Sequence, residues 1–250
     1  MGMAAGMVAV GGASAAATEK FAIEESPVSA ESVGSNRPAG HQSTVLWSVD
    51  TAERKVALTF DDGPLPEWTP LALDVLDEAK IRATFFVVGS RLATHANLVR
   101  KRYDRHEIGN HSWHHDDLSK LNYKDVMRSV GQTHDTIKRI TGRNATLLRP
   151  PWGKMGGTTV RVAGELGYDL ILWSLLVRDR ALHSHPDELV EDVVGGVRPG
   201  MIMLAHDVGR TTRLAALQQL PRMIRGLKDR GFTFVTVSEL RQSLPRQSGT

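Results

Sequence analysis

Cysteine is absent from this sequence of 250 residues. The absence excludes a disulfide framework, a thiolate metal site and a cysteine nucleophile. Any bound metal would therefore have to be held by histidine and carboxylate side chains.

Blocks of like charge are lacking as well. The 31 Lys and Arg residues against 28 Asp and Glu residues leave a net charge of +3, and these charges are scattered along the chain. So mild an excess does not indicate binding to nucleic acid, and we expect no nucleic-acid partner.

A long hydrophobic run is missing, and so is the basic start of a secretory signal. Residues 1–18 are rich in Ala, Gly, Val and Met and end in small residues, as the apolar region and cleavage site of a signal do, but no Lys or Arg precedes Lys20. A mis-assigned start codon and a disordered tail both explain this pattern. The segment is a poor membrane span, and we expect a secreted or cell-wall protein without a stable span.

One folded domain is expected after a polar N-terminal segment. Residues 24–43 are rich in Ser, Pro, Gly and Asn without an apolar period, which is typical of a linker. We therefore predict a signal-like and disordered segment over residues 1–43 and a single domain over residues 44–250, which is long enough to bury one core. We expect a monomer.

Within that domain, short apolar runs alternate with longer segments of helical period, the pattern of βα units around a parallel sheet. Strands are predicted over residues 56–60, 84–88, 107–110, 146–148, 170–175, 201–205 and 232–235. Helices are predicted over residues 70–79 with Thr69 as N-cap, 124–141, 186–197 and 214–230. Seven such units indicate a closed or nearly closed barrel, with residues 45–49 pairing with the first strand as a lid hairpin.

Unusual polar residues follow five of these strands, where βα barrels build their active sites. They are Asp61 and Asp62, the histidines 111, 114 and 115, Arg149, Asp179, and His206 with Asp207. Because the carboxyl ends of the strands share one end of a barrel, we expect these groups to converge there.

Asp61 and Asp62 are adjacent carboxylates that follow an apolar strand directly. Two such charges repel each other and lose solvent, so they require compensation, and a divalent cation is the simplest one. The alternative for this segment alone is an Asx turn that caps the next helix.

His111 and His115 are four residues apart, which lets both imidazoles face one ion. Two histidines and one carboxylate leave coordination positions open, as expected of a hydrolytic site and not of a structural one. Histidines satisfied within a polar loop are the alternative. His114 is expected to support the site or lie at the surface, and His183 and His185 are not expected to bind metal.

Three further side chains extend this hypothesis. His206 ends a buried strand and suits general acid chemistry, although a histidine bonded to backbone in the core is the alternative. Arg149 can hold a carboxylate in bidentate geometry, for chemistry or as a structural ion pair. Trp113 and Trp152 offer flat faces for sugar rings, although packing in the core is equally ordinary for them.

Together these residues resemble the polysaccharide deacetylases of carbohydrate esterase family four, which share the nodulation-protein B homology domain. Five segments match in order and spacing, within a similarity that covers about residues 45–244. They are Thr59-Phe-Asp-Asp-Gly-Pro, His111-Ser-Trp-His-His, Arg149-Pro-Pro-Trp-Gly, the weaker segment 173–180, and Leu204-Ala-His-Asp.

The resemblance implies a distorted (β/α)7 barrel of the α/β class with its active site at the carboxyl ends of the strands. It implies metal ligands Asp62, His111 and His115, usually for zinc, with Co²⁺ or another divalent ion as alternatives. It also implies Asp61 as catalytic base, His206 as catalytic acid, Arg149 to orient the base and Asp179 to support the acid. Trp152, Pro151, Trp113 and Arg180 are expected at the substrate.

The fourth segment departs from the family pattern. Leu176 stands where the family often has an acidic residue, and Arg180 stands where it has a tryptophan. A cation thus replaces an aromatic surface, which affects the substrate groove more than the chemistry, since Asp179 is retained.

The expected partner is an acetylated polysaccharide, and the expected reaction is N-deacetylation of N-acetylglucosamine units in peptidoglycan or chitin-like chains. O-deacetylation of xylan and hydrolysis of a small amide are alternatives at the same site. A catalytically silent carbohydrate-binding module would require loss of a ligand, the acid or the base, and none is lost.

Overall fold

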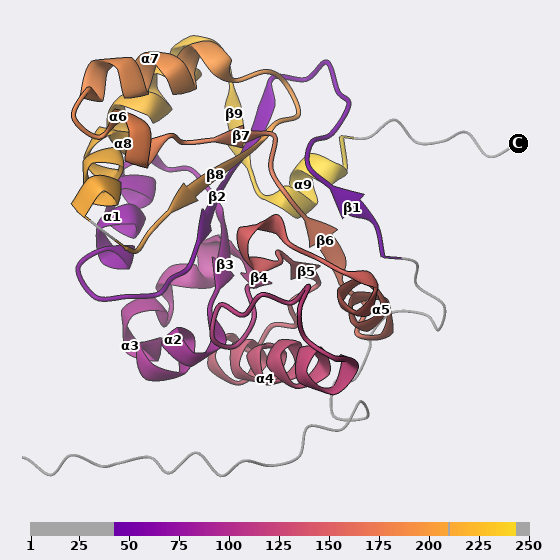
Figure 1. Ribbon diagram of the computed structural model, residues 1–250. Coiled ribbons are helices and arrows are strands. Elements are labelled where there is room, and N and C mark those ends of the chain that lie inside the picture. The colour runs from indigo at the N-terminus through magenta and orange to yellow at the C-terminus, as the bar shows by residue number, and fades with distance from the viewer. Residues whose placement is uncertain (1–42, 210, 244–250) are drawn as a thin grey trace, which may run out of the picture.

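A parallel sheet curled into a half-barrel forms the centre of the protein, and helices surround it, which makes a distorted (β/α)7 barrel (Figure 1). The computed structural model describes residues 43–209 and 211–243. The signal-like segment predicted for residues 1–43 therefore lies outside the described residues, apart from Ser43. The fold class predicted from the sequence is confirmed.

The strands run in the order β1-β6-β5-β4-β3-β2-β8-β7, and β9 pairs with β2 off this path. All of these strand pairs are parallel. The strands are β1 (Val45–Leu46), β2 (Lys55–Asp61), β3 (Thr84–Val87), β4 (Glu107–Asn110), β5 (Leu147–Leu148), β6 (Asp169–Ile171), β7 (Leu175–Leu176), β8 (Ile202–His206) and β9 (Thr233–Val235).

Helices cover the outer face of the sheet. In Figure 1, α1, α7 and α8 gather on one side of the strands and α2, α3 and α4 on another. The α-helices are α1 (Thr69–Ala79), α2 (Gly89–Thr94), α3 (Ala96–Val99), α4 (Tyr123–Thr141), α5 (Gly157–Glu165), α6 (Asp179–Leu182), α7 (Pro186–Gly196), α8 (Thr211–Asp229) and α9 (Val237–Arg241). Two 3₁₀ turns, η1 (Arg102–Arg105) and η2 (Pro151–Gly153), complete the connections.

The alternation of side chains along each strand produces two hydrophobic clusters. Phe85 packs toward the helices in the larger cluster, whereas its neighbour Phe86 belongs to the smaller cluster on the inner face of the curled sheet. On β2, Ala57 belongs to that inner cluster. Because the side-chain period of a strand is two residues, Thr59 and Asp61 face the interior as well.

Residues 170–175 do not form the single strand that their apolar run predicts. Asp169–Ile171 pair with β5 and β1, whereas Leu175–Leu176 pair with β8. Where β6 ends, the carbonyl oxygens of Ile171 and Leu172 accept hydrogen bonds from the side chain of Arg149. One run of apolar residues therefore serves two separate parts of the sheet.

The predicted lid hairpin is wrong. Val45 and Leu46 pair in parallel with Leu170 and Ile171 of β6, not with β2. Hydrophobic alternation indicates that a segment is extended, but it carries no information about which distant strand will be its partner.

Helix boundaries differ from the predicted ones by one to three residues, and one predicted cap is wrong. Thr69 is the first residue of α1 and not its N-cap, and its hydroxyl donates to Oδ2 of Asp207 at 2.6 Å. Helix α8 begins at Thr211, three residues before the predicted start. Helix α5 is the helix that follows the strand predicted at residues 146–148, for which no bounds were predicted. No helix in the described part of the chain is long and apolar enough to cross a membrane.

We predict that Phe85→Ala destabilises the fold strongly. The Phe85 ring is 1% exposed and stacks on Phe60 and Tyr103 at centroid distances of 5.1 and 4.8 Å. Truncation should lower the free energy of unfolding by about 3–5 kcal/mol, measured by urea denaturation. The matched change Val160→Ala on the exposed face of α5 should cost less than about 0.5 kcal/mol. Equal losses for both variants would contradict this packing.

Candidate active site

Asp61 is the last residue of β2 and faces the inner side of the sheet, where it meets a buried arginine. Nη1 of Arg149 lies 2.7 Å from Oδ1 of Asp61 and also donates to the hydroxyl of Thr59. Arg149 has no exposed surface, and its guanidinium lies 4.1 Å from the centre of the Phe86 ring. A buried carboxylate is thus held in one orientation by a fixed cation.

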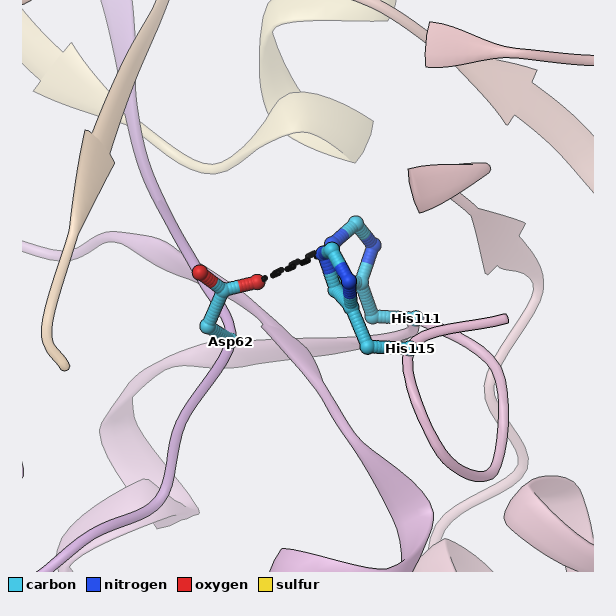
Figure 2. A group of neighbouring side chains, drawn as sticks. All are labelled: Asp62, His111 and His115. Atoms are coloured by element: carbon cyan, nitrogen blue, oxygen red, sulfur yellow. Dashed lines mark ion pairs between the residues drawn. The ribbon is translucent and has the colours of Figure 1, made fainter. Parts of the chain in front are cut away.

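Asp62, the next residue, belongs to a group of three possible metal ligands. Its Oδ1 lies 3.4 Å from Nε2 of His111 and 3.0 Å from Nε2 of His115. In Figure 2 the carboxylate and both imidazoles point toward one another, although Asp62 comes from the end of β2 and the histidines from the loop after β4. The three ligand atoms lie within 4.8 Å of one another.

The backbone around this group adopts left-handed conformations that residues other than glycine rarely take. The φ angles are +79° at Asp62, +65° at Ser112, +63° at His115 and +55° at Trp152. Each such residue costs about 1–3 kcal/mol and persists only where the surrounding structure holds it. Their concentration at one place supports a functional site, because strained backbone conformations are typically kept where they hold functional side chains in position.

The tautomer of His111 is set by the backbone. Its Nδ1 lies 2.7 Å from the carbonyl oxygen of Arg149, so Nδ1 carries the proton and Nε2 offers its lone pair to the site. This is the arrangement that orients a metal-binding imidazole. Arg149 therefore acts twice, with its side chain on Asp61 and with its carbonyl on His111.

The charges of the group favour a cation. Burial raises the pKa of Asp62, but His111 and His115 outweigh it and hold that pKa far below its usual range. Burial lowers the pKa of His111, but Asp61 and Asp62 outweigh it, so that pKa is raised. The raised pKa of His111 reflects the negative charge of the two carboxylates, and the lowered pKa of Asp62 shows that positive charge beside it stabilises its ionised form, as a bound metal would.

The residues fit a divalent metal. Oδ1 of Asp62 is buried and forms no hydrogen bond, which is costly for a carboxylate oxygen unless a ligand completes it. Asp62, His111 and His115 are the only group of three such side chains found in residues 43–209 and 211–243. His183 and His185, which were not expected to bind metal, lie at the exposed ends of α6 and α7.

His206 lies beside Asp61. Because β2 and β8 pair in parallel, Asp61 and His206 occupy opposite positions on neighbouring strands. Nδ1 of His206 lies 3.5 Å from Oδ2 of Asp179, the first residue of α6. The structure thus brings together groups from the five strand ends that the sequence predicts to converge, whereas His114 is exposed.

Several contacts at the site could not be found from motifs. Arg213, in the first turn of α8, lies 2.8 Å from Oδ2 of Asp62, and Arg91 donates to the carbonyl oxygen of Asp62.

Burial raises the pKa of Asp207 to about 7. A Cβ on Gly63 would lie 2.4 Å from Oδ2 of that carboxyl group, so only glycine fits there.

The predicted substrate-binding residues are placed differently from one another. Trp152 is 57% exposed with its ring centre 4.3 Å from that of His115, and Pro151 is buried behind it. Arg180 is exposed one residue after Asp179. Trp113 packs its ring against Gly89 of α2 and is half-buried. Only Trp152 therefore offers an exposed face in contact with the candidate ligands.

Comparison with known proteins agrees with this arrangement. Residues 48–171 match the family described as polysaccharide deacetylase. A peptidoglycan-N-acetylglucosamine deacetylase of Bacillus cereus is 34% identical over 206 residues, which cover 81% of this chain and 94% of that protein. The chain belongs to the polysaccharide deacetylase family. The resemblance noted in the sequence is confirmed.

Two further relatives delimit the similarity. The peptidoglycan-N-acetylmuramic acid deacetylase PdaC of Bacillus subtilis is 36% identical over 78% of this chain, but the match spans only 40% of that protein. The crystal structure of the Bc1960 peptidoglycan N-acetylglucosamine deacetylase superposes with a TM-score of 0.75 at 30% identity, covering 79% of this chain and 92% of that one. This chain therefore spans less than half the length of PdaC.

We predict that His115→Ala weakens metal binding and that His114→Ala does not. His115 faces Asp62, whereas its neighbour His114 is exposed. Calorimetric titration of metal-free protein with Zn²⁺ should give one site for the wild type and for His114→Ala. Saturation at about 100 times the dissociation constant should stabilise both proteins by about 2.7 kcal/mol, a gain that His115→Ala should lose. Equal affinities in all three proteins would refute this ligand set.

Proposed function

We propose that this chain is a metal-dependent hydrolase that removes acetyl groups from a polysaccharide, with N-acetylglucosamine units of peptidoglycan or chitin-like chains as substrate. The observation that carries the proposal is the pairing of Asp61 with His206 on adjacent strands, beside the group of Asp62, His111 and His115. Enzymatic hydrolysis of an amide uses a general base, a general acid and a Lewis acid that polarises the carbonyl group. Asp61 and His206 would supply the base and the acid, and Asp62, His111 and His115 would hold a metal as the Lewis acid.

We propose zinc as the native ion, held by Asp62, His111 and His115. Two imidazoles and one carboxylate form a ligand set found in zinc hydrolases, and Co²⁺ is a possible substitute. A divalent ion at this site would polarise the acetyl carbonyl and lower the pKa of a bound water from 15.7 to roughly 7.

Asp61 is proposed as the general base. Its Oδ1 is held by Arg149, which leaves Oδ2 directed toward the histidine ligands, 3.6 Å from Nε2 of His111. A carboxylate so placed can take a proton from the attacking water without binding the metal itself. Since Arg149 has no exposed surface, the orientation of this base is insulated from solvent.

His206 is proposed as the general acid, supported by Asp179. Cleavage of an amide requires a proton on the departing nitrogen, because an amine anion is a very poor leaving group. Nδ1 of His206 lies near Asp179, so Nε2 of His206 is the atom that would deliver the proton. Trp152 would border the bound sugar, with Pro151, Arg180 and Trp113 as further proposed groove residues.

The catalytic domain is proposed to span residues 44–250, with action at the cell wall after export. The names of the relatives support a peptidoglycan substrate. The monomeric state expected from the sequence remains a prediction. Assays for released acetate on peptidoglycan, chito-oligomers and acetylxylan, with and without chelator, would identify the substrate.

We predict that Asp61→Asn lowers acetate release from the best of these substrates by at least about 100-fold, because the amide cannot accept the proton from water. Zinc affinity, measured in parallel, should be retained, since Asp62 and both histidines are unchanged. Asp50→Asn, at an exposed aspartate, should behave like the wild type. Full activity of Asp61→Asn would remove Asp61 from the role of base.

We also predict that the effect of His206→Asn depends on the leaving group. Acetate release from an N-acetylated oligomer should fall by about 100- to 10,000-fold. Hydrolysis of an aryl acetate should fall much less, because a phenolate departs without protonation, whereas Asp61→Asn should slow both substrates. An equal loss on amide and aryl ester in His206→Asn would show that His206 is not the acid.

A further inference from the structure

Arg213 lies between the two halves of the candidate active site. Its Nη1 is 2.8 Å from Oδ2 of Asp62, and its Nε is 3.6 Å from Oδ2 of Asp179. The same oxygen of Asp179 is 3.5 Å from Nδ1 of His206. One guanidinium thus joins the carboxylate of the metal group to the carboxylate that supports the proposed acid.

Local structure does not favour an arginine at this position. Arg213 is the third residue of α8, and a cation in the first turn of a helix opposes the helix dipole. Its placement must therefore depend on its tertiary contacts with Asp62 and Asp179. Nη1 also donates a local hydrogen bond to the carbonyl oxygen of Val208 at 3.1 Å.

The preceding loop leaves room for this side chain. Gly209 has a φ of +126°, and a Cβ there would lie 2.8 Å from Cδ and 3.0 Å from Nη1 of Arg213. A side chain at residue 209 would therefore displace the arginine. Glycine at position 209 therefore leaves the space in which Arg213 reaches Asp62.

The contact with Arg213 determines how Asp62 can bind an ion. Oδ2 accepts the hydrogen bond from Nη1, whereas Oδ1 faces His111 and His115. A carboxylate with one oxygen engaged in this way presents only the other to a metal. Groups that hydrogen-bond to metal ligands typically contribute about 10- to 100-fold to affinity or activity.

The contact with Asp179 serves the other half of the site. Asp179 is 6% exposed and lies on α6, a helix of only four residues. Nε of Arg213 and Nδ1 of His206 both approach Oδ2 of this carboxylate, so Arg213 supplies a positive charge beside the oxygen that faces His206. Since a planar guanidinium can address two carboxylates at once, arginine suits this position and lysine does not.

We propose that Arg213 is a positioning residue that holds Asp62 in one-oxygen coordination and, through Asp179, keeps His206 aligned for proton donation. The inference rests on the proposed deacetylase function for its second part. Its first part, the effect on Asp62, concerns metal binding alone.

The decisive variant is Arg213→Lys, which keeps the positive charge near the metal but loses the planar fork. Zinc affinity, measured by competition with a chromophoric chelator, should fall by about 10- to 100-fold. The ratio of amide to aryl acetate hydrolysis should also fall, as in His206→Asn. Arg213→Met should show the same fall in this ratio, and kcat should change more than KM in both variants.

Arg222→Met is the matched control. Arg222 lies on the same helix, is exposed, and pairs with Asp187 at 2.7 Å. Its polar contacts in the described part of the chain, with Asp187 and Gln219, include none of the proposed metal ligands. It should retain the zinc affinity and the amide to ester ratio of the wild type. Thermal unfolding of each metal-free protein would identify a variant that fails to fold, and Arg213→Lys then decides because it conserves length and charge.

The outcomes separate the two proposals. Wild-type zinc affinity and a wild-type amide to ester ratio in Arg213→Lys would overturn the role of Arg213. Reduced zinc affinity in Arg213→Lys, together with no acetate release by the wild type from any substrate, would support the metal part and refute the deacetylase function. Equal losses in Arg213→Lys and Arg222→Met would also overturn the inference, since they would indicate a general effect of the helix surface.

Discussion

Two neighbouring carboxylates, Asp61 and Asp62, are buried together at the end of the central strand β2, and the site is arranged around the charge that they bring. A buried ion without a partner costs several kcal/mol, roughly, even after the protein relaxes. Each carboxylate has a partner of its own. Asp61 is paired with Arg149, whereas Asp62 faces two imidazoles and accepts a hydrogen bond from Arg213.

The different surroundings of the two carboxylates follow from the geometry of one strand end. Asp61 continues the inward face that Ala57 and Thr59 begin, so it points into the half-barrel, where Arg149 is fully enclosed. At Asp62 the chain turns into a left-handed conformation with a φ of +79°, which takes its side chain out of the strand pattern and toward His111 and His115. Adjacent residues of one chemical type thereby acquire separate roles.

The two halves of the site also differ in their exposure. Asp61 and Arg149 belong to the sheet and its interior, which suits a base whose orientation must not vary. His206, Asp179 and Arg213 meet where β8, the short α6 and the first turn of α8 come together, and the side chain of Arg213 is 22% exposed. Trp152, also exposed, stands beside His115. The partly exposed side chains of the site are therefore those of His115, His206 and Arg213, at 22%, 15% and 22%, with Trp152 beside them.

Much of the fold could be inferred from local pattern, and the exceptions share one cause. The choice of Asp62 rather than Asp61 as a metal ligand came from the resemblance to a family and not from local pattern. The run 170–175 is apolar throughout, which identifies extended chain but conceals its division between β6 and β7. The segment 45–49 was assigned to β2, although its partner is β6. Trp113 stands next to the ligands in sequence, but only the structure shows that its ring is half-buried against Gly89 of α2. Neighbourhood along the chain does not fix the direction of a side chain in a loop.

By itself the sequence determined that βα units surround a parallel sheet and that Asp61, Asp62, His111, His115, Arg149 and His206 share its carboxyl end. Those conclusions depend on periodicity and on residue types at strand ends, which are local properties. Only the tertiary structure decided that Arg213 joins Asp62 to Asp179 and which edge of the sheet receives β1. An arginine in a helix has the same local pattern whether it faces solvent or two carboxylates, because its partners are distant in the chain and are brought to it by folding.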